Sequence, residues 1–372
     1  MRALLLAGGK ATRLRPLTER TPKAMTPLLG RPFLEHLLAW LAQHEIRDVT
    51  LLLGYLPDPI RAYFGDGHQF GIKLAYLVEE EPLGSGGAIK QVESLLTEPF
   101  FALNADVFFD MDLGAMARAH QRAGAELSIA LTEVEDTSPY GVVALDEAGW
   151  IRRFVEKPKP ADAPSHMINA GVWLFSPEAL HRIEPGRFTM VEQDLFPQLA
   201  QAGKLLGYPT DAYWMDAGTP QRYLQLQRDI LGGRVAGALA ILERPGWAGL
   251  SVRPLGGGPE ERGAPPVLES GASVQGAVVL GAGVLLGAGS QVEGPTTLGA
   301  RTRVGARAII SDSVIWQDGE IGAGALVGGS ILADRCVVGA GAQIEDCVLG
   351  EGARVGPGVQ LHGRTLNPGE II

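Results

Sequence analysis

Aliphatic residues recur at every sixth position over much of the last third of this 372-residue chain, and this repeat restricts the fold more than any other feature. Such a hexad period is the sequence signature of a parallel β-helix. One aliphatic side chain per hexad points inward and stacks on its equivalents in neighbouring coils, while glycines permit the corners. The series, with some five-residue steps from Ile310 onward, is Leu268, Val274, Leu280, Leu286, Val292, Leu298, Val304, Ile310, Ile315, Ile321, Val327, Leu332, Val338, Ile344, Leu349, Val355 and Leu361.

Glycine and aromatic residues divide the chain into two parts. Of the 50 glycines, 31 lie in residues 232–372, whereas 22 of the 24 aromatic residues lie before residue 232. Only Trp247 and Trp316 follow. A narrow β-helix core explains the shortage of aromatic side chains. We therefore predict two architectures, with a domain at 1–231, a connector at 232–266 and a parallel β-helix at 267–372.

Composition excludes several classes of protein. A formal net charge of -10 argues against a general nucleic-acid binder, which usually carries a basic excess. The two cysteines, Cys336 and Cys347, cannot build a disulfide framework and are expected to be small packing residues. The apolar run near the N-terminus is too short for a secretory signal, and no apolar stretch approaches the ~20 residues that span a bilayer. We expect a cytoplasmic protein without a membrane segment.

The first 231 residues alternate strand and helix patterns. The expected elements are a strand at Ala3–Ala7, a helix at Pro32–Gln43, strands at Val49–Leu53 and Leu74–Val78, a helix at Gly86–Leu96 and a strand at Phe100–Leu103. This alternation predicts parallel βαβ units in an α/β fold. Such sheets bind ligands at the carboxyl ends of their strands. The loops that follow these strands are therefore the places to look for chemistry.

The first of these loops carries paired glycines and several basic residues. Gly8 and Gly9 would let backbone N–H groups approach a phosphate, and Arg13 and Lys23 would supply positive charge. A tight turn with solvated basic residues is the simpler alternative. The loop matches neither the Walker pattern nor the dinucleotide glycine pattern.

The complete loop resembles the signature of the sugar-1-phosphate nucleotidyltransferases. The matching residues are Gly8, Gly9, Thr12, Arg13, Leu14, Pro16, Leu17, Thr18, Pro22 and Lys23. Ala11 departs from the pattern, because the family carries glycine there. If that position needs a positive φ, alanine introduces backbone strain, which affects turnover more than the fold.

Later segments match the same family in the same order. Glu79–Ala88 resembles its base-recognition loop, and Asn104–Asp106 and Trp214–Pro220 resemble its two metal-binding segments. The sugar-site segments correspond to Tyr140–Val143, Phe154–Pro158 and Asn169–Val172. The resemblance covers roughly residues 1–230 and implies a Rossmann-like domain with a mixed, mainly parallel sheet.

The resemblance implies attack by a sugar 1-phosphate oxygen on the α-phosphorus of a nucleoside triphosphate, which expels pyrophosphate. Mg²⁺ would be held by Asp106 and Asp216, since this ion prefers oxygen ligands. Structural alternatives are a turn-capping role for Asp106 and a helix start at Thr219 that involves Asp216. The implied catalytic residues are Arg13, Lys23, Asp106, Lys157 and Asp216.

The same resemblance assigns two groups of binding residues. The nucleotide-binding group is Leu6, Ala7, Gly8, Gly9, Lys10, Thr12, Arg13, Lys23, Glu79, Glu81, Pro82, Gly84, Ser85 and Asp106. The sugar-phosphate group is Tyr140, Gly141, Glu156, Lys157, Asn169 and Gly171. Adjacent strand residues point in opposite directions, so Glu156 and Lys157 can share one ligand only if the backbone bends there. For Asn169 and Gly171 a plain turn role is the alternative.

The base-recognition loop favours guanine. A carboxylate can accept hydrogen bonds from both N1–H and the exocyclic amine of guanine, whereas an amide suits thymine or uracil. By its spacing from Gly84, Glu79 falls where related pyrimidine enzymes carry glutamine, so Glu79 is the first candidate and Glu81 the second. An acidic run at a solvated strand end is the alternative. The loop looks most like that of guanylyltransferases for mannose 1-phosphate or manno-heptose 1-phosphate.

Two other functions are weighed. The chain could use dTTP or UTP with glucose 1-phosphate, or it could be a nucleotide-sugar-binding regulatory subunit with weak catalysis, which Ala11 favours. The repeat resembles hexapeptide-repeat proteins, and this resemblance implies that the β-helix at 267–372 is left-handed. Acyltransferases among those proteins use a histidine base. His362 is the only histidine between residues 182 and 372. We therefore expect the β-helix to support homo-oligomerisation or regulation. His36, in the first predicted helix, is expected to be a surface or capping residue.

Overall fold

The computed structural model describes residues 1–235, 252–255 and 264–372. These residues fall into two compact units. Unit 1 comprises Met1–Gly9 and Leu37–Met215, and unit 2 comprises Lys10–His36 and Asp216–Ile372. Among the described residues no helix is long and apolar enough to cross a membrane.

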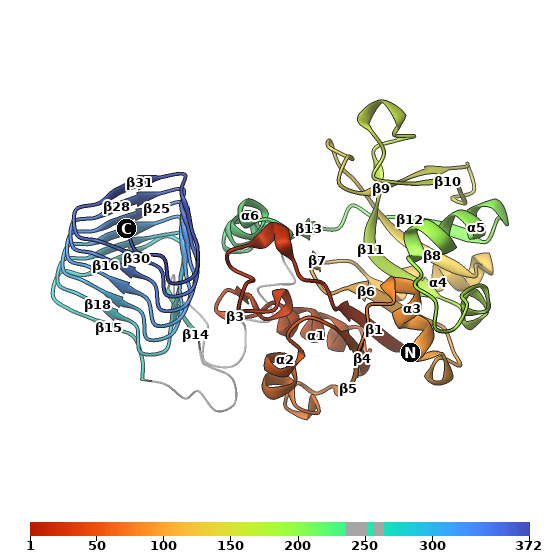
Figure 1. Cartoon of the computed structure of the whole chain (residues 1–372), viewed down its shortest axis with the longest axis horizontal. Helices are drawn as coiled ribbons and strands as arrows, with labels where there is room; N and C mark the ends of the chain where they lie inside the picture. Colours follow the sequence, from red (N-terminus) through yellow and green to blue (C-terminus); the bar gives the residue numbers. More distant parts are fainter. Residues whose placement is uncertain (236–251, 256–263) are drawn as a thin grey trace. The chain divides into compact units, whose positions relative to one another are not determined.

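Unit 1 contains a nine-stranded mixed sheet (Figure 1). Its main path runs β10-β9-β11-β6-β1-β4-β5, while β8 pairs with β11 and β12 with β8. The four strands from β6 to β5 are parallel, and β11 joins β6 in the antiparallel direction. The strands are β1 Arg2–Ala7, β4 Asp48–Leu53, β5 Lys73–Val78, β6 Phe100–Asn104, β8 Leu127–Glu133, β9 Gly141–Leu145, β10 Ile151–Glu156, β11 Met167–Phe175 and β12 Leu205–Pro209.

The helices follow these strands, as expected for an α/β fold. They are α1 Phe33–Gln43, α2 Pro57–Phe64, α3 Gly84–Gln91, α4 Leu113–Ala123, α5 Phe196–Gln201 and α6 Pro220–Leu231. Two short strand pairs complete the region: β2 Pro27–Leu28 with β3 Arg31–Pro32, and β7 Val107–Phe109 with β13 Trp214–Asp216. The expected helix at Gly86–Leu96 begins two residues earlier and ends as α3 at Gln91, before a separate 3₁₀ turn.

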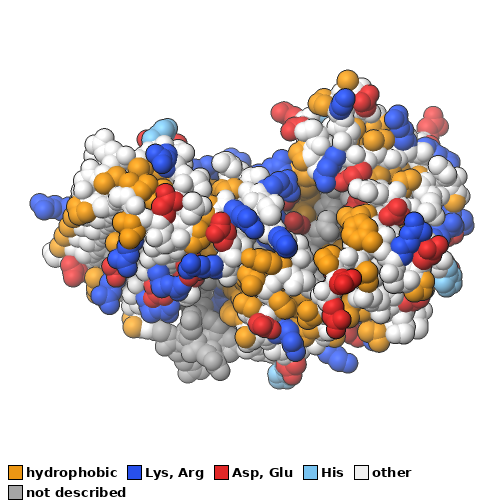
Figure 2. Space-filling view, viewed as in Figure 1, with side chains coloured by type: hydrophobic (Ala, Val, Ile, Leu, Met, Phe, Trp, Pro, Cys, Tyr) orange, Lys and Arg blue, Asp and Glu red, His pale blue; other side chains and the backbone are white. Residues whose placement is uncertain are grey.

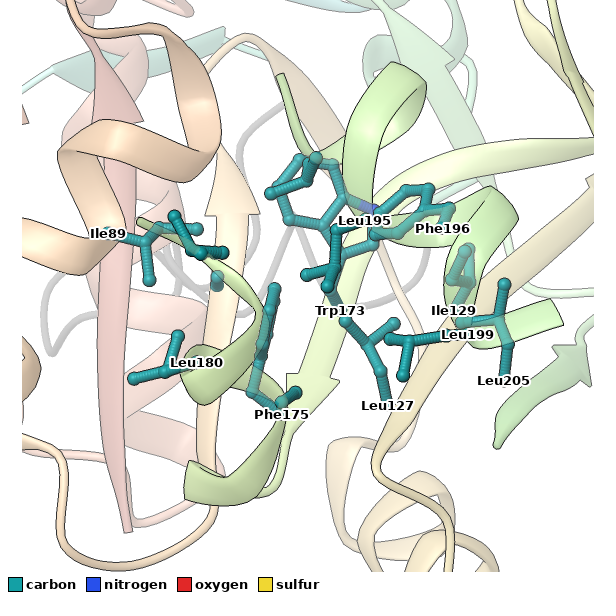
Figure 3. Packing of buried hydrophobic residues seen from close by; sticks show 14 of the residues in the cluster. Ile89, Leu127, Ile129, Trp173, Phe175, Leu180, Leu195, Phe196, Leu199 and Leu205 are labelled. Atoms are coloured by element: carbon teal, nitrogen blue, oxygen red, sulfur yellow. The ribbon is translucent and has the colours of Figure 1, made fainter. Parts of the chain in front are cut away.

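The core of unit 1 joins the sheet to α3 and α5. Figure 3 shows Trp173 of β11 beside Phe196 of α5, with Phe175 and Leu199 in the same cluster. The rings of Trp173 and Phe196 meet edge to face with centroids 5.5 Å apart. Burial of such large side chains is the main force that holds helices on a sheet. This packing fixes the strand ends from which the candidate site loops emerge.

In unit 2 a parallel β-helix is built from three sheets of stacked short strands, consistent with the left-handed form. The first sheet stacks β14, β17, β20, β23, β26, β29 and β32; the second β15, β18, β21, β24, β27 and β30; the third β16, β19, β22, β25, β28 and β31. Their bounds are β14 Val252–Leu255, β15 Val267–Leu268, β16 Ser273–Gln275, β17 Val278–Gly281, β18 Leu285–Leu286, β19 Gln291–Glu293, β20 Thr296–Leu298, β21 Arg303–Val304, β22 Ile309–Ser311, β23 Val314–Ile315, β24 Glu320–Ile321, β25 Leu326–Gly328, β26 Ile331–Leu332, β27 Val337–Val338, β28 Gln343–Glu345, β29 Val348–Leu349, β30 Arg354–Val355, β31 Gln360–His362 and β32 Thr365–Leu366.

Each aliphatic residue of the hexad series lies in its own strand, and equivalent residues pair in register. In the second sheet, for example, Leu286 pairs with Val304 and Val304 with Ile321. Most members are fully buried, but Leu268 is 47% exposed because it lies in the first strand of its sheet. The strand β14 lies inside the stretch expected to be a connector and pairs with β17. Figure 2 shows side chains of both charges interspersed over the visible face of the β-helix.

Two smaller expectations have different outcomes. Cys336 and Cys347 are buried in the β-helix core, as expected for packing residues, and burial raises the pKa of the Cys336 thiol to about 12. His36, however, is not a surface residue. It is only 1% exposed, its Nε2 lies 2.8 Å from the carbonyl oxygen of Leu28, and burial lowers its pKa.

Candidate functional site

The paired glycines lie directly after β1 and have different surroundings. A Cβ atom added to Gly54 would come within 2.9 Å of the Gly8 carbonyl oxygen, and the N–H of Tyr55 donates to that same oxygen at 3.2 Å. Gly8 is therefore packed against the loop after β4. A Cβ at Gly9 would meet nothing within 4 Å. Protein packing therefore does not require glycine at position 9, and the residue is exposed.

Glu79 is the acidic residue that reaches the glycine loop. Its Oε2 lies 3.4 Å from where a Cβ of Gly8 would stand, and its Oε1 accepts a hydrogen bond from the N–H of Leu83 at 3.1 Å. Glu81 and Pro82 are exposed. The geometry thus favours Glu79 over Glu81 as the acidic group beside the Gly8 loop.

The glycine run at the start of α3 serves packing. Gly84 has φ +75°, and a Cβ there would come within 2.5 Å of the Thr189 carbonyl oxygen. That oxygen accepts the N–H of Gly86 at 2.8 Å. The hydroxyl of Ser85 accepts the N–H of Val191 at 2.9 Å and donates to Glu192 Oε2 at 3.0 Å. Both the glycines and the Ser85 hydroxyl therefore hold the distant segment 187–192.

Glu192 is a candidate that the sequence did not indicate. It lies in a π-helical turn, Val191–Leu195, a local geometry that is frequent at functional sites. Burial is the largest influence on the carboxyl group of Glu192 and raises its pKa. Hydrogen bonds from its own backbone N–H and from Ser85 lower this pKa. The charge of Glu156 raises the pKa further, and the charge of Lys157 lowers it. These last two influences place Glu192 in the electrostatic field of the predicted sugar-site pair.

Glu156 and Lys157 come together through the bend that strand geometry demands. Lys157 has φ +46°, and its N–H donates to the Tyr140 carbonyl oxygen at 3.0 Å. Its Nζ then lies 3.1 Å from Glu156 Oε1, although the Lys157 side chain is 64% exposed. A left-handed lysine costs about 1–3 kcal/mol and is typical of functional positions. A Cβ at Gly141 would stand 2.3 Å from Phe154 Cζ and 2.8 Å from Glu156 Oε2, so a larger residue there would have to displace these side chains.

Asn169 and Gly171 form an irregular turn within β11. The Asn169 Oδ1 accepts from the N–H of Gly171 at 3.0 Å and from the Trp173 indole at 2.9 Å. Gly171 has φ +80°, and a Cβ there would come within 3.1 Å of Asn104 Nδ2. These hydrogen bonds show that Asn169 stabilises the turn, the structural role weighed beside its proposed contact with the sugar. The indole N–H of Trp214 donates to the Ala170 carbonyl oxygen at 2.9 Å and so stabilises the same turn.

Asp106 occupies the turn between β6 and β7. The N–H of the preceding Ala105 donates to the Leu6 carbonyl oxygen at 3.1 Å, which ties this turn to the end of β1. Leu6 and Ala7 are the last two residues of that strand. The strand β7, which starts at Val107, pairs with β13, and Asp216 is the last residue of β13.

In unit 2, three cationic side chains surround the carboxylate of Asp216. Its oxygens lie 3.4 Å from Arg222 Nη1, 3.6 Å from Lys23 Nζ and 3.7 Å from Arg13 Nη2. Asp216 is 6% exposed, and a Cβ at Gly218 would stand 2.8 Å from its Oδ1. The cluster carries three positive charges against one negative charge, so it suits a polyphosphate. We call Arg13, Lys23 and Arg222 the cation ring.

The sequence pattern did not indicate Arg222 as a site residue, although it predicts the start, at Thr219, of the helix that carries Arg222. Thr219 is the N-cap of α6 and accepts the N–H of Arg222 at 3.3 Å. A basic residue in the first turn of a helix is unfavourable with the helix dipole. That conflict between helix position and charge is the signal that could have identified Arg222.

Ala11 adopts the left-handed conformation that the family's glycine would accept without strain, with φ +45° and ψ +47°. Its carbonyl oxygen accepts hydrogen bonds from the Thr18 hydroxyl at 2.9 Å and from the N–H of Leu14 at 3.0 Å. These bonds hold the strained conformation. Thr12 starts the following 3₁₀ turn and is exposed, as is Lys10.

The fold and these loops define a nucleotide-handling α/β protein, and comparison with known proteins identifies its class. The nucleotidyl transferase family model matches residues 2–232, so the chain belongs to the nucleotidyl transferase family. A second model, the GMPPB C-terminal domain, matches residues 271–372.

Relatives with established names are similar over the first part of the chain. The mannose-1-phosphate guanylyltransferase of Mycobacterium tuberculosis is 39% identical over 62% of this chain and 65% of its own length. The mannose-1-phosphate guanylyltransferase catalytic subunit beta of Xenopus tropicalis is 40% identical over 60% of this chain and 63% of its own length. The chain therefore spans less than two thirds of the length of these relatives.

Solved structures show the same α/β fold. HddC from Yersinia pseudotuberculosis matches with a TM-score of 0.53 and 28% identity, over 60% of this chain and 96% of that one. HddC complexed with GMP-PN matches with a TM-score of 0.52 and 27% identity, over the same shares. A structure described as a glucose-1-phosphate thymidylyltransferase from Bacillus anthracis has a TM-score of 0.56, at 24% identity over 64% of this chain and 95% of that one.

Proposed function

We propose that this protein transfers a guanylyl group from GTP to mannose 1-phosphate and releases GDP-mannose and pyrophosphate. The observation that carries the proposal is the cation ring around Asp216, in which Arg13 and Lys23 come from the signature residues and Arg222 from α6. The substrates are proposed from the names of relatives that are 39–40% identical.

The chemistry requires positioning and charge, and it needs no covalent protein intermediate. A phosphate oxygen of the sugar phosphate attacks the α-phosphorus of GTP. The bond from that phosphorus to the oxygen bridging to the β-phosphate breaks, and pyrophosphate leaves with its electron pair. The cation ring would bind the triphosphate, and Gly9, where an added Cβ would meet no protein atom within 4 Å, is a proposed nucleotide contact. Lys157 would bind the phosphate of the sugar, with Glu156 accepting from its hydroxyl groups.

Mg²⁺ fits the donor chemistry of the two predicted ligands. Asp106 and Asp216 offer hard carboxylate oxygens, and Asp216 lies among cations that would also bind phosphate oxygens. When bound, the ion would neutralise charge on the phosphates. The residues that surround Asp216 hold its carboxylate at a fixed place in unit 2.

Guanine selection is proposed for Glu79. Its carboxylate is held at the glycine loop by the Leu83 N–H, whereas Glu81 points to solvent as an exposed residue. Tyr140, Gly141, Asn169 and Gly171 remain proposed sugar neighbours, and the other nucleotide-site residues remain proposed contacts. We keep the proposed division at 1–231, 232–266 and 267–372, with self-association through the β-helix.

One observation supports a second function, that of a regulatory subunit that binds nucleotide-sugars. The left-handed Ala11 lies in the middle of the signature loop, where strain would slow turnover. The pyrimidine alternative with glucose 1-phosphate has weaker support, because Glu79, and not an amide, faces the Gly8 loop.

Pyrophosphate release tests the proposal. The protein is incubated with GTP, dTTP or UTP, each paired with mannose 1-phosphate or glucose 1-phosphate, with and without Mg²⁺. We expect release with GTP and mannose 1-phosphate only when Mg²⁺ is present. Glu79→Gln should lower the GTP/dTTP ratio of kcat/KM by about tenfold or more, as expected when a charged hydrogen bond to the base is lost. The matched control Glu81→Gln should leave the ratio unchanged. Release with dTTP or UTP alone would contradict the guanine assignment.

A further inference from the structure

Trp316 is an exception to the composition of the β-helix. It follows Ile315, whose side chain belongs to the aliphatic core. Trp316 directly follows β23, and side chains alternate along extended backbone; unlike Ile315 it is not part of the aliphatic core, so it points out of the β-helix. The residue is nevertheless only 2% exposed, and its indole Nε1 donates a hydrogen bond to the hydroxyl of Tyr223 at 3.0 Å. An outward tryptophan that is buried and hydrogen-bonded has a specific partner, here the first turn of α6.

Tyr223 in turn contacts the segment that follows the signature residues Gly8–Lys23. Its hydroxyl donates to the Pro27 carbonyl oxygen, and burial raises the pKa of Tyr223, so the hydroxyl keeps its proton. A second α6 residue, Gln227, accepts the N–H of Leu29 at 3.2 Å and donates to Pro27 at 3.4 Å. Two residues of α6, Tyr223 and Gln227, therefore hold the segment Pro27–Leu29 by hydrogen bonds.

The two segments joined by Tyr223 are the ones that meet at Asp216. Pro27 lies shortly after Lys23, and Tyr223 lies shortly after Asp216. The Lys23 Nζ is 3.6 Å from Asp216, and the Lys23 side chain is only 10% exposed. Any shift of Pro27 relative to α6 would therefore move an ammonium group relative to the carboxylate beside it.

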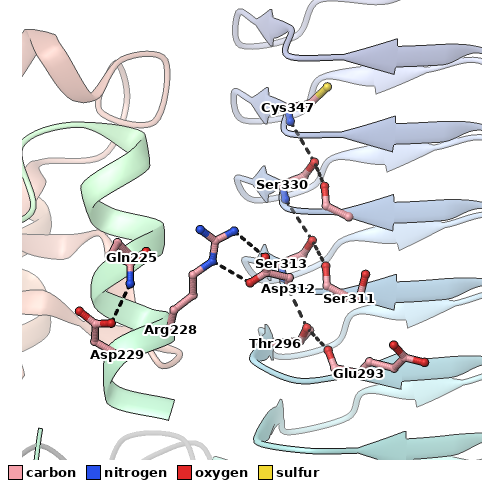
Figure 4. A network of polar contacts seen from close by, with 11 residues as sticks. Gln225, Arg228, Asp229, Glu293, Thr296, Ser311, Asp312, Ser313, Ser330 and Cys347 are labelled. Carbon is pink, nitrogen blue, oxygen red and sulfur yellow. Dashed lines mark hydrogen bonds and ion pairs between the residues drawn. The ribbon is translucent and has the colours of Figure 1, made fainter. Parts of the chain in front are cut away.

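A second contact holds α6 to the β-helix. Figure 4 shows the guanidinium of Arg228 facing the carboxylate of Asp312, with two hydrogen bonds of 2.7 and 2.6 Å. Asp312 stands at a corner of the coil in the left-handed conformation. The paired geometry fixes the direction of α6 as well as its distance. A third pair, Arg20 with Glu351 at 3.6 Å, joins the signature segment to the β-helix directly.

We propose that Trp316 is a positioning residue through which the β-helix sets the geometry of Lys23 and Asp216 by way of the Tyr223 hydroxyl. The β-helix then contributes to nucleotidyl transfer within one chain, in addition to any self-association. The inference rests on the proposed function for its kinetic readout. Its structural content, the dependence of Lys23 on Trp316, does not need the enzyme to be active.

The test compares two tryptophan-to-phenylalanine variants. Trp316→Phe keeps an aromatic ring and removes the indole N–H that binds Tyr223. Trp40→Phe is the matched control, because Trp40 is 6% exposed and its indole nitrogen makes no hydrogen bond within the described parts of the chain. We expect Trp316→Phe to lower kcat about tenfold with a smaller change in KM for mannose 1-phosphate. Trp40→Phe should change kcat less than twofold.

A double substitution tests whether Trp316 acts through Tyr223. If it does, Trp316→Phe combined with Tyr223→Phe should be no slower than Tyr223→Phe alone. Normal kcat in Trp316→Phe, or losses that multiply in the double variant, would overturn the proposal.

Chemical labelling of Lys23 supplies a readout without turnover. The acetylation rate of Lys23, followed by mass spectrometry, should rise several-fold in Trp316→Phe and stay unchanged in Trp40→Phe, with the exposed Lys73 as internal reference. Wild-type protein that transfers no nucleotidyl group refutes the proposed function alone, whereas an unchanged Lys23 rate in Trp316→Phe refutes this inference.

Discussion

The β-helix and the loops of unit 1 use glycine and positive φ for different purposes. In the β-helix, glycines and a few aspartate and arginine residues turn corners, and each inward aliphatic residue stacks on an equivalent one coil away. In unit 1, Gly54 and Gly84 allow distant backbone segments to touch, and Lys157 bends a strand so that it meets Glu156. The β-helix is thus specified by local repetition, and the loops by contacts remote in sequence. We expect loop substitutions to change activity without stability, and substitutions in the β-helix core to do the reverse.

The largest expected effect is that of Asp106→Asn. This change keeps the size of the side chain in the turn after β6 and removes one carboxylate charge. If Asp106 holds Mg²⁺ as proposed, kcat/KM should fall by on the order of 10³-fold, which corresponds to about 4 kcal/mol of lost transition-state stabilisation. The melting temperature should stay the same. Asp110→Asn, at the far end of β7, is the control, and near-normal rates in Asp106→Asn would refute the metal role.

A core substitution in the β-helix should show the opposite pattern. Leu298 is fully buried, so Leu298→Ala should lower the free energy of unfolding by about 2–5 kcal/mol. Leu326→Ala removes the same atoms from an outward position that is 40% exposed and should cost much less. Below the unfolding transition, kcat should be unchanged in both variants. Denaturant unfolding and steady-state kinetics measure the two quantities, and equal stability losses would contradict the inward stacking.

The smallest expected effect is that of a substitution at Ala11, a loop residue whose left-handed conformation lowers the stability of the protein. Ala11→Gly relieves the left-handed strain at φ +45° and should raise the free energy of unfolding by about 1 kcal/mol. Gly9→Ala is the matched reverse change, because a Cβ there meets no protein atom within 4 Å. It should leave stability intact and weaken nucleotide binding. A destabilised Ala11→Gly protein would show that Ala11 contributes favourable contacts that outweigh its strain.

Much of this fold can be predicted from the sequence because its signals are local. Alternating strand and helix patterns predicted the elements of the α/β sheet, and the hexad placed each inward residue in its own strand. The bend at Lys157 followed from the opposite directions of adjacent strand side chains. Ala11 was predicted to be strained if its φ were positive, which it is.

The remainder depends on contacts that a single sequence does not display. Gly84 and Gly86 pack against Thr189, which lies about a hundred residues later in the chain. The sequence near the two glycines therefore gives no sign of this packing role. Glu192 lies in a π-helical turn, for which the sequence shows no periodic pattern. The carbonyl oxygen near His36 Nε2 belongs to Leu28, which precedes the helix, so the pattern of the helix alone does not reveal that His36 is buried. Arg222 lies beside Asp216 only because the chain folds α6 against that carboxylate, and the sequence alone does not show this contact.

The fate of the α-phosphate of GTP tests the central claim most directly. The protein is incubated with mannose 1-phosphate and Mg²⁺, together with GTP that carries a radioactive label on either the α- or the γ-phosphate. The account predicts that the α-label appears in GDP-mannose and the γ-label in pyrophosphate, in equal amounts. Release of the γ-label as inorganic phosphate, or the absence of any labelled nucleotide-sugar while GDP-mannose itself binds the protein, would contradict nucleotidyl transfer.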